Sequence, residues 1–122
     1  MKNALVVDDF RSIRTVVATI LKKEGFTVTE AENGLDALKY LDGSIKFDII
    51  ISDVDMPVMG GIPLIKELRT KSSYKNTSVI MLTSNPIERK INEIQGLNIK
   101  EWLVKPFDYL NFKKIIEDCQ QN

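Results

Sequence analysis

The stretch Ala4-Leu5-Val6-Val7-Asp8-Asp9 is a short apolar run that ends in two carboxylates. Three later runs have the same pattern: each consists mostly of apolar residues and is followed by one polar side chain. Continuous apolar runs of this length are typical of strands that are buried on both faces of a parallel sheet. The carboxyl ends of such strands meet at one edge, where open α/β sheets bind ligands. The later runs and their end residues are 49–52 with Asp53, 79–82 with Thr83, and 102–104 with Lys105.

Stretches of helical period separate these runs, and the first of them places Ile13, Val17, Ile20 and Leu21 on one face before Gly25 ends the helix. Alternating strands and helices predict an α/β fold, with a five-stranded parallel sheet, right-handed crossovers and helices on both faces. The other expected strands span 27–31, 47–52, 79–83 and 101–105. The second helix carries Leu35, Leu38 and Leu41 and stops near Gly43, and the third carries Leu64, Ile65 and Leu68, with Pro63 in its first turn. The fourth helix begins at Asn85-Pro86 and carries Ile87, Ile91 and Ile94, and the last begins at about Tyr109 and carries Phe112, Ile116 and Cys119.

Length and composition exclude several classes of protein. A chain of 122 residues suits one domain, which we expect to span 1–122. The lack of histidine excludes a His-ligated zinc site and a Ser-His-Asp triad, and the single cysteine excludes an internal disulfide. The 17 basic and 17 acidic residues balance, so no global field favours nucleic acid. Since the chain shows neither a membrane-spanning run nor a secretory signal, we expect a cytoplasmic protein without membrane insertion.

The polar residues at the strand ends form a set suited to metal and phosphate chemistry. Carboxylates gathered at one edge repel one another, and Mg²⁺ relieves this repulsion because it prefers oxygen ligands and joins carboxylates to phosphate. Asp8, Asp9 and Asp53 fit such a site. A carboxylate can also attack phosphorus and form an acyl phosphate. The metal, the Lys105 ammonium and the Thr83 hydroxyl would stabilise the charge on the transferred phosphoryl oxygens.

Short motifs stand in a fixed order along the chain: Val7-Asp8-Asp9-Phe10, Glu30-Ala31-Glu32-Asn33-Gly34, Ser52-Asp53-Val54-Asp55-Met56-Pro57, Gly61, Thr83-Ser84 and Lys105-Pro106-Phe107. Together they resemble the receiver domain of two-component response regulators, and within that family the CheY-like single-domain chemotaxis regulators. The resemblance covers almost the whole chain. It implies a flavodoxin-like sheet with the strand order 2-1-3-4-5. It also implies that the chain is a phosphoprotein that acts as a phosphorylation-dependent signalling switch in a two-component or phosphorelay pathway.

The resemblance also implies a role for each acidic residue. The aspartate that ends the third strand accepts the phosphoryl group in such receivers, and here that residue is Asp53. Mg²⁺ would be held by Asp8, Asp9, Asp53 and Asp55. Asp9 matches the direct ligand, Asp8 the one that acts mainly through water, and Asp55 the one that offers its backbone carbonyl. The side chain of Asp55 adds a carboxylate at a position that varies in the family, and we expect it to alter the lifetime of the acyl phosphate.

The residues that respond to phosphorylation follow from the same resemblance. Thr83 and Lys105 match the residues that bind the phosphoryl oxygens, and Trp102 stands where the family has its switch aromatic. The family usually has a cis peptide bond before its proline, which makes Lys105-Pro106 a candidate. The output face would be the fourth helix, fifth strand and fifth helix, with Lys90, Ile91, Trp102 and Lys113 as candidate partner contacts.

The resemblance implies partners of two kinds. A histidine kinase or phosphotransfer protein would supply the phosphoryl group, and a downstream protein would read the output face. The chain would then not be a turnover enzyme, since it would catalyse only its own phosphorylation and dephosphorylation.

Other interpretations of these residues are open at this stage. Taken singly, Asp8 or Asp9 can cap a helix, Asp53 can open a loop, and Lys105 can be a solvated charge. The Asp53-Val54-Asp55 pair also suits haloacid-dehalogenase-like phosphatases, although there the pair normally follows the first strand. A receiver-shaped binding module that never takes phosphate is a third alternative.

Overall fold

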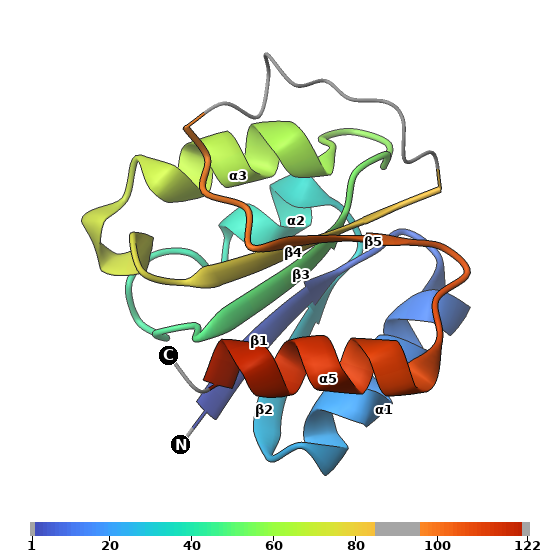
Figure 1. Ribbon diagram of the computed structural model, residues 1–122. Coiled ribbons are helices and arrows are strands. Elements are labelled where there is room, and N and C mark those ends of the chain that lie inside the picture. The colour runs from blue at the N-terminus through green and yellow to red at the C-terminus, as the bar shows by residue number, and fades with distance from the viewer. Residues whose placement is uncertain (1, 85–95, 121–122) are drawn as a thin grey trace.

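A five-stranded parallel sheet in the order β2-β1-β3-β4-β5 lies at the centre of the fold (Figure 1). The computed structural model describes residues 2–84 and 96–120. The flavodoxin-like strand order expected from the sequence is therefore confirmed. The elements are β1 (Lys2–Val7), α1 (Arg11–Lys23), β2 (Phe26–Ala31), α2 (Gly34–Leu38), β3 (Ile49–Asp53), α3 (Gly61–Arg69), the 3₁₀ turn η1 (Ser72–Tyr74), β4 (Ser78–Thr83), β5 (Glu101–Val104) and α5 (Tyr109–Gln120).

Strands β1 and β3 are the inner strands that carry the acidic motifs. Every residue of β3 is buried, as expected for a strand covered on both faces. The parallel register pairs Ala4 with Ile49 and Val7 with Ser52. The next residues along each strand, Asp8 and Asp53, therefore leave the sheet at the same edge.

Helices cover both faces of the sheet, as Figure 1 shows, with α1 and α5 on one face and α2 and α3 on the other. Alternate strand residues serve the two faces, because successive side chains of a strand point in opposite directions. Leu5 and Val7 of β1 pack in the core under α2 and α3, whereas Ala4 and Val6 pack in the core under α1 and α5. The sheet edge with the acidic residues is thus held by two separate cores.

Three helices agree closely with their expected positions. Helix α1 buries Val17, Ile20 and Leu21 and gives way to Gly25, whose φ of +93° is readily adopted by glycine. Helix α3 has Pro63 in its first turn, where a missing N–H costs little. Helix α5 begins at Tyr109 and buries Phe112 and Ile116. The apolar spacing of these helices was a reliable guide to the face that each one buries.

Helix α2 corrects the sequence interpretation. It ends at Leu38, and Leu35, which was expected on its apolar face, is 56% exposed. Gly34 and Ala37 form the buried face instead, and the Gly34 backbone N–H donates to the Met59 carbonyl at 2.9 Å. An added Cβ at Gly34 would lie 2.7 Å from the Met59 Cγ, so this close approach requires glycine. The leucine spacing was wrong for Leu35 alone, because Leu38 packs against the core and Leu41, beyond the helix, is buried.

Other boundaries shift by a residue or two or lie outside the described residues. Strand β3 begins at Ile49, and Phe47, expected within it, is buried just before the strand, where its carbonyl accepts from the Thr77 hydroxyl at 2.7 Å. The expected helix from Asn85-Pro86, with Lys90 and Ile91, lies outside the described residues. The Lys105-Pro106 peptide bond is cis, which confirms that prediction. In the described part of the chain, we find no helix with the length and apolar character needed to cross a membrane.

Candidate functional site

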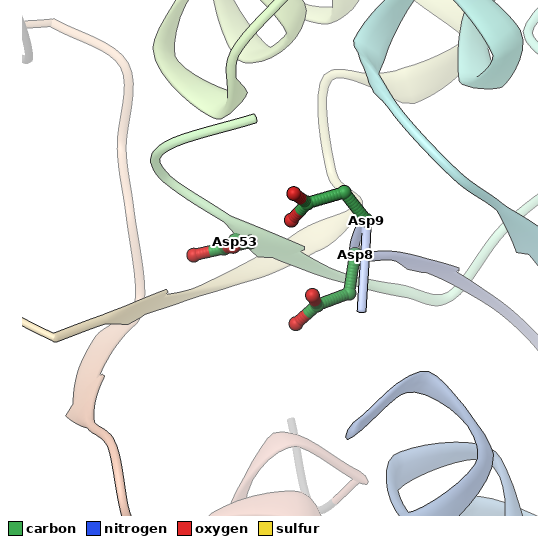
Figure 2. Close-up of side chains that lie close together, drawn as sticks. All are labelled: Asp8, Asp9 and Asp53. Carbon is green, nitrogen blue, oxygen red and sulfur yellow. The ribbon is translucent and has the colours of Figure 1, made fainter. Parts of the chain in front are cut away.

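Three carboxylates gather at the carboxyl edge of the sheet (Figure 2). Asp8 and Asp9 follow β1, and Asp53 is the last residue of β3. One oxygen from each lies within 4.8 Å of the others. Asp8 is fully buried and Asp53 is 5% exposed. We call Asp8, Asp9 and Asp53 the acidic cluster; the structure brings these predicted metal ligands together.

The loop between β1 and α1 fixes Asp8 firmly. The Phe10 backbone N–H donates to Asp8 Oδ1 at 2.9 Å, and the Asp8 backbone N–H donates to the Ala31 carbonyl at 3.2 Å. The first contact is a local turn in which an aspartate accepts from the backbone two residues on. Asp8 is therefore oriented before any ligand arrives.

Asp9 contrasts with its neighbour. Its Oδ1 atom is buried and has no hydrogen-bond partner among the described residues. A buried carboxylate oxygen without a partner is costly, because it has lost water without gaining a compensating donor. A hard divalent cation removes this cost, and three carboxylates within reach of one point are the donor set that Mg²⁺ prefers. The cluster fits a magnesium ion, with Asp9 offering the least engaged oxygen.

Lys105 brings a cation into the cluster from the end of β5. Its Nζ lies 3.1 Å from Asp8 Oδ2 and 3.3 Å from Asp53 Oδ2. The Lys105 side chain is 14% exposed, and its backbone N–H donates to the Thr83 carbonyl at 2.8 Å. The structure places Lys105 beside Asp8 and Asp53, and its role in binding phosphoryl oxygens stays a prediction.

The balance of charge leaves Asp53 strained electrostatically. Burial first and the neighbouring Asp8 carboxylate second raise the pKa of the Asp53 carboxyl, and Lys105 acts in the opposite direction, with a net pKa of about 6. Desolvation disfavours the charged form of any carboxyl, and a like charge nearby adds to this. One ammonium does not offset three carboxylates. The metal-free cluster therefore favours a further cation.

The loop after β3 holds the Asp53 backbone in place. The Val54 backbone N–H donates to the Leu82 carbonyl at 3.0 Å, and the Gly61 N–H donates to the Val54 carbonyl at 2.9 Å. A Cβ at Gly61 would collide with the Asp53 carbonyl oxygen and lie 2.8 Å from the Met81 Cε. Only glycine allows α3 to begin this close to the strand end.

Asp55 lies apart from the other acids. Its side chain is exposed, and it is not among the carboxylates that share the cluster. It lines an open pocket of about 430 Å³ beside the loop, together with residues such as Met56 and Pro63. This separation does not favour the phosphatase alternative, in which Asp53 and Asp55 would act together as nucleophile and acid. The expected metal contact of Asp55 through its backbone carbonyl stays a prediction.

The candidate switch residues lie on β4 and β5. Thr83 is buried and follows Leu82, which pairs with Asp53. Trp102 pairs with Met81 across β4 and β5, and its partly buried side chain packs against the core under α2 and α3. Lys113 is partly buried on α5. Lys90 and Ile91, the other expected partner contacts, lie outside the described residues.

Arg14 is a member of this region that the sequence analysis missed. It lies on α1, donates to the Asp8 carbonyl and pairs with Glu30 of β2. Its position between Ile13 and Val17, on the inward side of the helix, was the feature of the sequence that could have indicated a specific contact for Arg14. A charged residue near the apolar face of a helix often has a specific partner beneath it.

Comparisons with known proteins agree with this geometry. The family model described as "Response regulator receiver domain" matches residues 4–117. The chain belongs to the response regulator receiver family. Chemotaxis protein CheY-3 of Vibrio cholerae is 35% identical over 114 residues, which are 93% of this chain and 87% of that protein. Chemotaxis protein CheY of Pseudomonas aeruginosa is 35% identical over 93% of this chain and 91% of its own.

Solved receiver structures share the fold, and magnesium is bound in some of them. Chemotaxis response regulator CheY4 of Vibrio cholerae has a TM-score of 0.87 and 39% identity, with 98% of each chain covered. Response regulator TrrA of Thermotoga maritima, in complex with Mg²⁺-BeF, has a TM-score of 0.83 and 32% identity, covering 98% of this chain and 99% of its own. This protein is thus a CheY-like receiver domain of two-component systems, a class associated with signalling.

Proposed function

We propose that residues 1–122 form a single receiver domain that accepts a phosphoryl group on Asp53 from a phosphohistidine of a kinase or phosphotransfer protein. The observation that carries this proposal is the acidic cluster, in which Asp53 contacts Lys105 at 3.3 Å and Asp9 has a buried oxygen without a partner among the described residues. The receiver family and its CheY relatives support the same role.

The residues of the cluster divide the chemistry among them. A carboxylate oxygen of Asp53 attacks phosphorus and forms an O–P bond while the N–P bond of the phosphohistidine breaks, and the leaving imidazole takes up a proton. Lys105 stabilises the charge on the phosphoryl oxygens. Asp8, Asp9, Asp53 and the backbone carbonyl of Asp55 would hold Mg²⁺, which supplies further charge stabilisation to the transferred group.

Phosphorylation then biases a two-state region that begins at the carboxyl end of β4, next to Asp53, and extends to β5. The new phosphoryl group adds negative charge and acceptor oxygens next to Thr83, whose hydroxyl is drawn toward it. Trp102 follows, and the downstream protein reads the face that includes Trp102, Lys113 and, outside the described residues, Lys90 and Ile91. The phosphoryl group selects between two states of this face. The chain catalyses its own phosphorylation and dephosphorylation and turns over no separate substrate.

Mass spectrometry after incubation with acetyl phosphate and Mg²⁺ tests the acceptor directly. We expect one added phosphoryl group on the wild type and none on Asp53→Asn, because the amide is a poor nucleophile. Chelation of Mg²⁺ with EDTA should suppress labelling of the wild type. Labelling that persists in Asp53→Asn would reassign the acceptor, and steady hydrolysis of generic phosphomonoesters would instead favour the phosphatase alternative.

Asp55→Asn is expected to change the lifetime of the acyl phosphate. Asp55 is exposed and lines a pocket beside the loop that follows Asp53, so its charge can act on a water molecule that approaches the phosphorus. The measurement is the rate of loss of ³²P from the purified phosphoprotein, with and without the substitution. Asp48→Asn, at an exposed carboxylate just before β3 and at the opposite end of that strand from Asp53, is the control. Equal rates for Asp55→Asn and wild type would remove Asp55 from the mechanism.

A further inference from the structure

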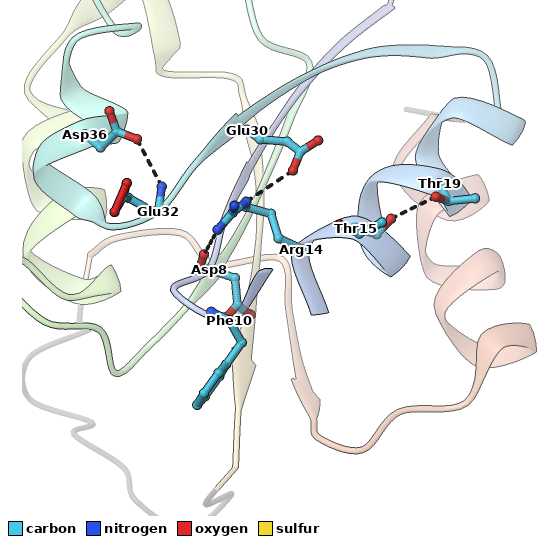
Figure 3. Close-up of polar contacts among 8 residues, drawn as sticks. All are labelled: Asp8, Phe10, Arg14, Thr15, Thr19, Glu30, Glu32 and Asp36. Carbon is cyan, nitrogen blue, oxygen red and sulfur yellow. Dashed lines mark hydrogen bonds and ion pairs between the residues drawn. The ribbon is translucent and has the colours of Figure 1, made fainter. Parts of the chain in front are cut away.

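Arg14 joins three parts of the molecule next to the acidic cluster (Figure 3). Its Nη1 donates to the Asp8 carbonyl oxygen at 2.8 Å, and its Nε donates to Glu30 Oε1 at 3.1 Å. The Arg14 side chain is 17% exposed and the Glu30 side chain 38%. One guanidinium thus links α1, the loop after β1, and β2.

The Asp8 carbonyl belongs to the peptide unit that joins Asp8 to Asp9. Because a peptide unit is planar, fixing its carbonyl direction restricts where the following Cα can lie. Two backbone donors hold the same loop. The Phe10 backbone N–H donates to Asp8 Oδ1 at 2.9 Å, and the Arg14 backbone N–H donates to the Phe10 carbonyl at 3.0 Å. These contacts lie on both sides of Asp9. They fix the backbone of Asp9 while leaving its Oδ1 without a partner among the described residues.

We infer that Arg14, oriented by Glu30, is a positioning residue for the metal site, because it sets the direction from which the Asp9 carboxylate enters the acidic cluster. The inference rests on the proposed function, since it assumes that the cluster binds Mg²⁺. Arg14 would not contact the metal itself. It acts through the peptide bond between two ligands, much as outer-shell partners orient metal ligands elsewhere.

Charge alone makes the opposite prediction, which allows a sharp test. Arg14 is a cation near a site for a cation, so its removal should strengthen Mg²⁺ binding if only Coulomb attraction and repulsion mattered. If Arg14 positions the loop, its removal should weaken binding. The sign of the change therefore separates positioning from electrostatics.

Isothermal titration calorimetry with MgCl₂ on Arg14→Gln measures this sign. We expect the Kd for Mg²⁺ to rise about tenfold, at the low end of the ~10- to 100-fold losses seen when outer-shell partners are removed. Arg14→Lys keeps the charge, but one ammonium does not replace a planar fork that reaches two acceptors, so an intermediate Kd is expected. Urea unfolding of each metal-free variant confirms that the protein is folded and measures the separate cost in stability.

Arg11→Gln is the matched control. Arg11 is exposed in the first turn of the same helix, and its substitution removes an equal charge near the loop. We expect Mg²⁺ binding of Arg11→Gln to stay at or slightly above the wild-type affinity. Binding by Arg14→Gln that equals or exceeds that of the wild type would overturn the positioning role, even if the variant is less stable. A wild type that does not bind Mg²⁺ would overturn the proposed function, and the positioning role with it.

If Arg14→Gln does not fold, the comparison of Arg14→Lys with the wild type decides the question. A raised Kd for this folded, charge-retaining variant supports the positioning role, because its net charge is unchanged. An unchanged Kd overturns it. Both results are independent of a loss in overall stability, which acts on the population of folded protein and is measured by the urea titration.

Discussion

Without Mg²⁺, Lys105→Met is expected to lower the free energy of unfolding by about 2–3 kcal/mol. Lys105 Nζ lies 3.1 Å from Asp8 and 3.3 Å from Asp53, whose side chains are 1% and 7% exposed. Methionine keeps the length of the side chain but leaves two buried carboxylates without their cation. Removing one partner of a fully buried pair costs ~3–5 kcal/mol, and the position of this cluster at the sheet edge reduces that figure.

Magnesium should restore much of the stability lost in Lys105→Met. A cation that binds the folded state stabilises it, and it relieves more repulsion where Lys105 is missing. Urea unfolding at pH 7, in EDTA and in saturating MgCl₂, measures both effects. Lys114→Met, at an exposed position of α5, is the control and should behave as the wild type. If Lys105→Met unfolds at the wild-type urea concentration in EDTA, Lys105 does not offset the carboxylates.

Asp53→Asn is expected to have the opposite effect on the metal-free protein. The pKa of the Asp53 carboxyl is raised from 3.8 to about 6, first by burial and then by Asp8, so the folded state holds this proton more tightly than the unfolded state does. Stability from this group is fully present below pH 4 and is lost as the pH rises to about 6. At about 1.4 kcal/mol per pH unit over that interval, the free energy of unfolding of the wild type falls by about 2–3 kcal/mol. Asp53→Asn does not lose this stability, because its amide does not ionise.

The measurement is the free energy of unfolding of both proteins in EDTA between pH 4 and pH 7.5. The two curves should nearly meet at pH 4 and separate progressively until pH 6, with Asp53→Asn more stable above that pH. Lys105 keeps its contact with Asp8 in this variant, so its charge stays paired. Asp55→Asn, at an exposed carboxylate nearby, should follow the wild type throughout. Parallel curves for wild type and Asp53→Asn would show that Asp53 carries no electrostatic penalty.

The two predictions together describe a site that is built at the expense of stability. Removing the cation destabilises the protein, whereas removing one of the anions stabilises it. This is the pattern expected where function requires charges of one sign to lie close together. It also explains why the cluster is suited to a metal ion, which replaces the repulsion among the carboxylates with attraction.

Much of the fold followed from the sequence because local patterns and long-range packing agreed. The runs that end in Asp8 and Asp53 are strongly apolar, and the covered strands they predict form the centre of the sheet. Their parallel register then brought the two carboxylates to one edge. The acidic cluster was predictable for the same reason, since it depends only on which strand each aspartate follows.

The failures came from contacts that a periodic pattern does not contain. Leu35 follows the spacing of an inward-facing residue, yet it is exposed, and Gly34 makes the close contact with Met59 instead. Arg14 was overlooked because its acceptors, the Asp8 carbonyl and Glu30, lie 6 and 16 residues away along the chain. A backbone carbonyl also has no identity in a sequence, so a side chain that depends on one gives no motif.

The ion pair between Lys105 and Asp8 bears on the stage of folding at which the site is assembled. Its two residues are 97 positions apart, and they meet only when β5 has joined a sheet whose interior is already β1 and β3. Contacts of such high sequence separation form late, because a long loop must close first. A partly folded chain has its aspartates but lacks their lysine, so completion of the last strand is also the step that makes the site chemically whole.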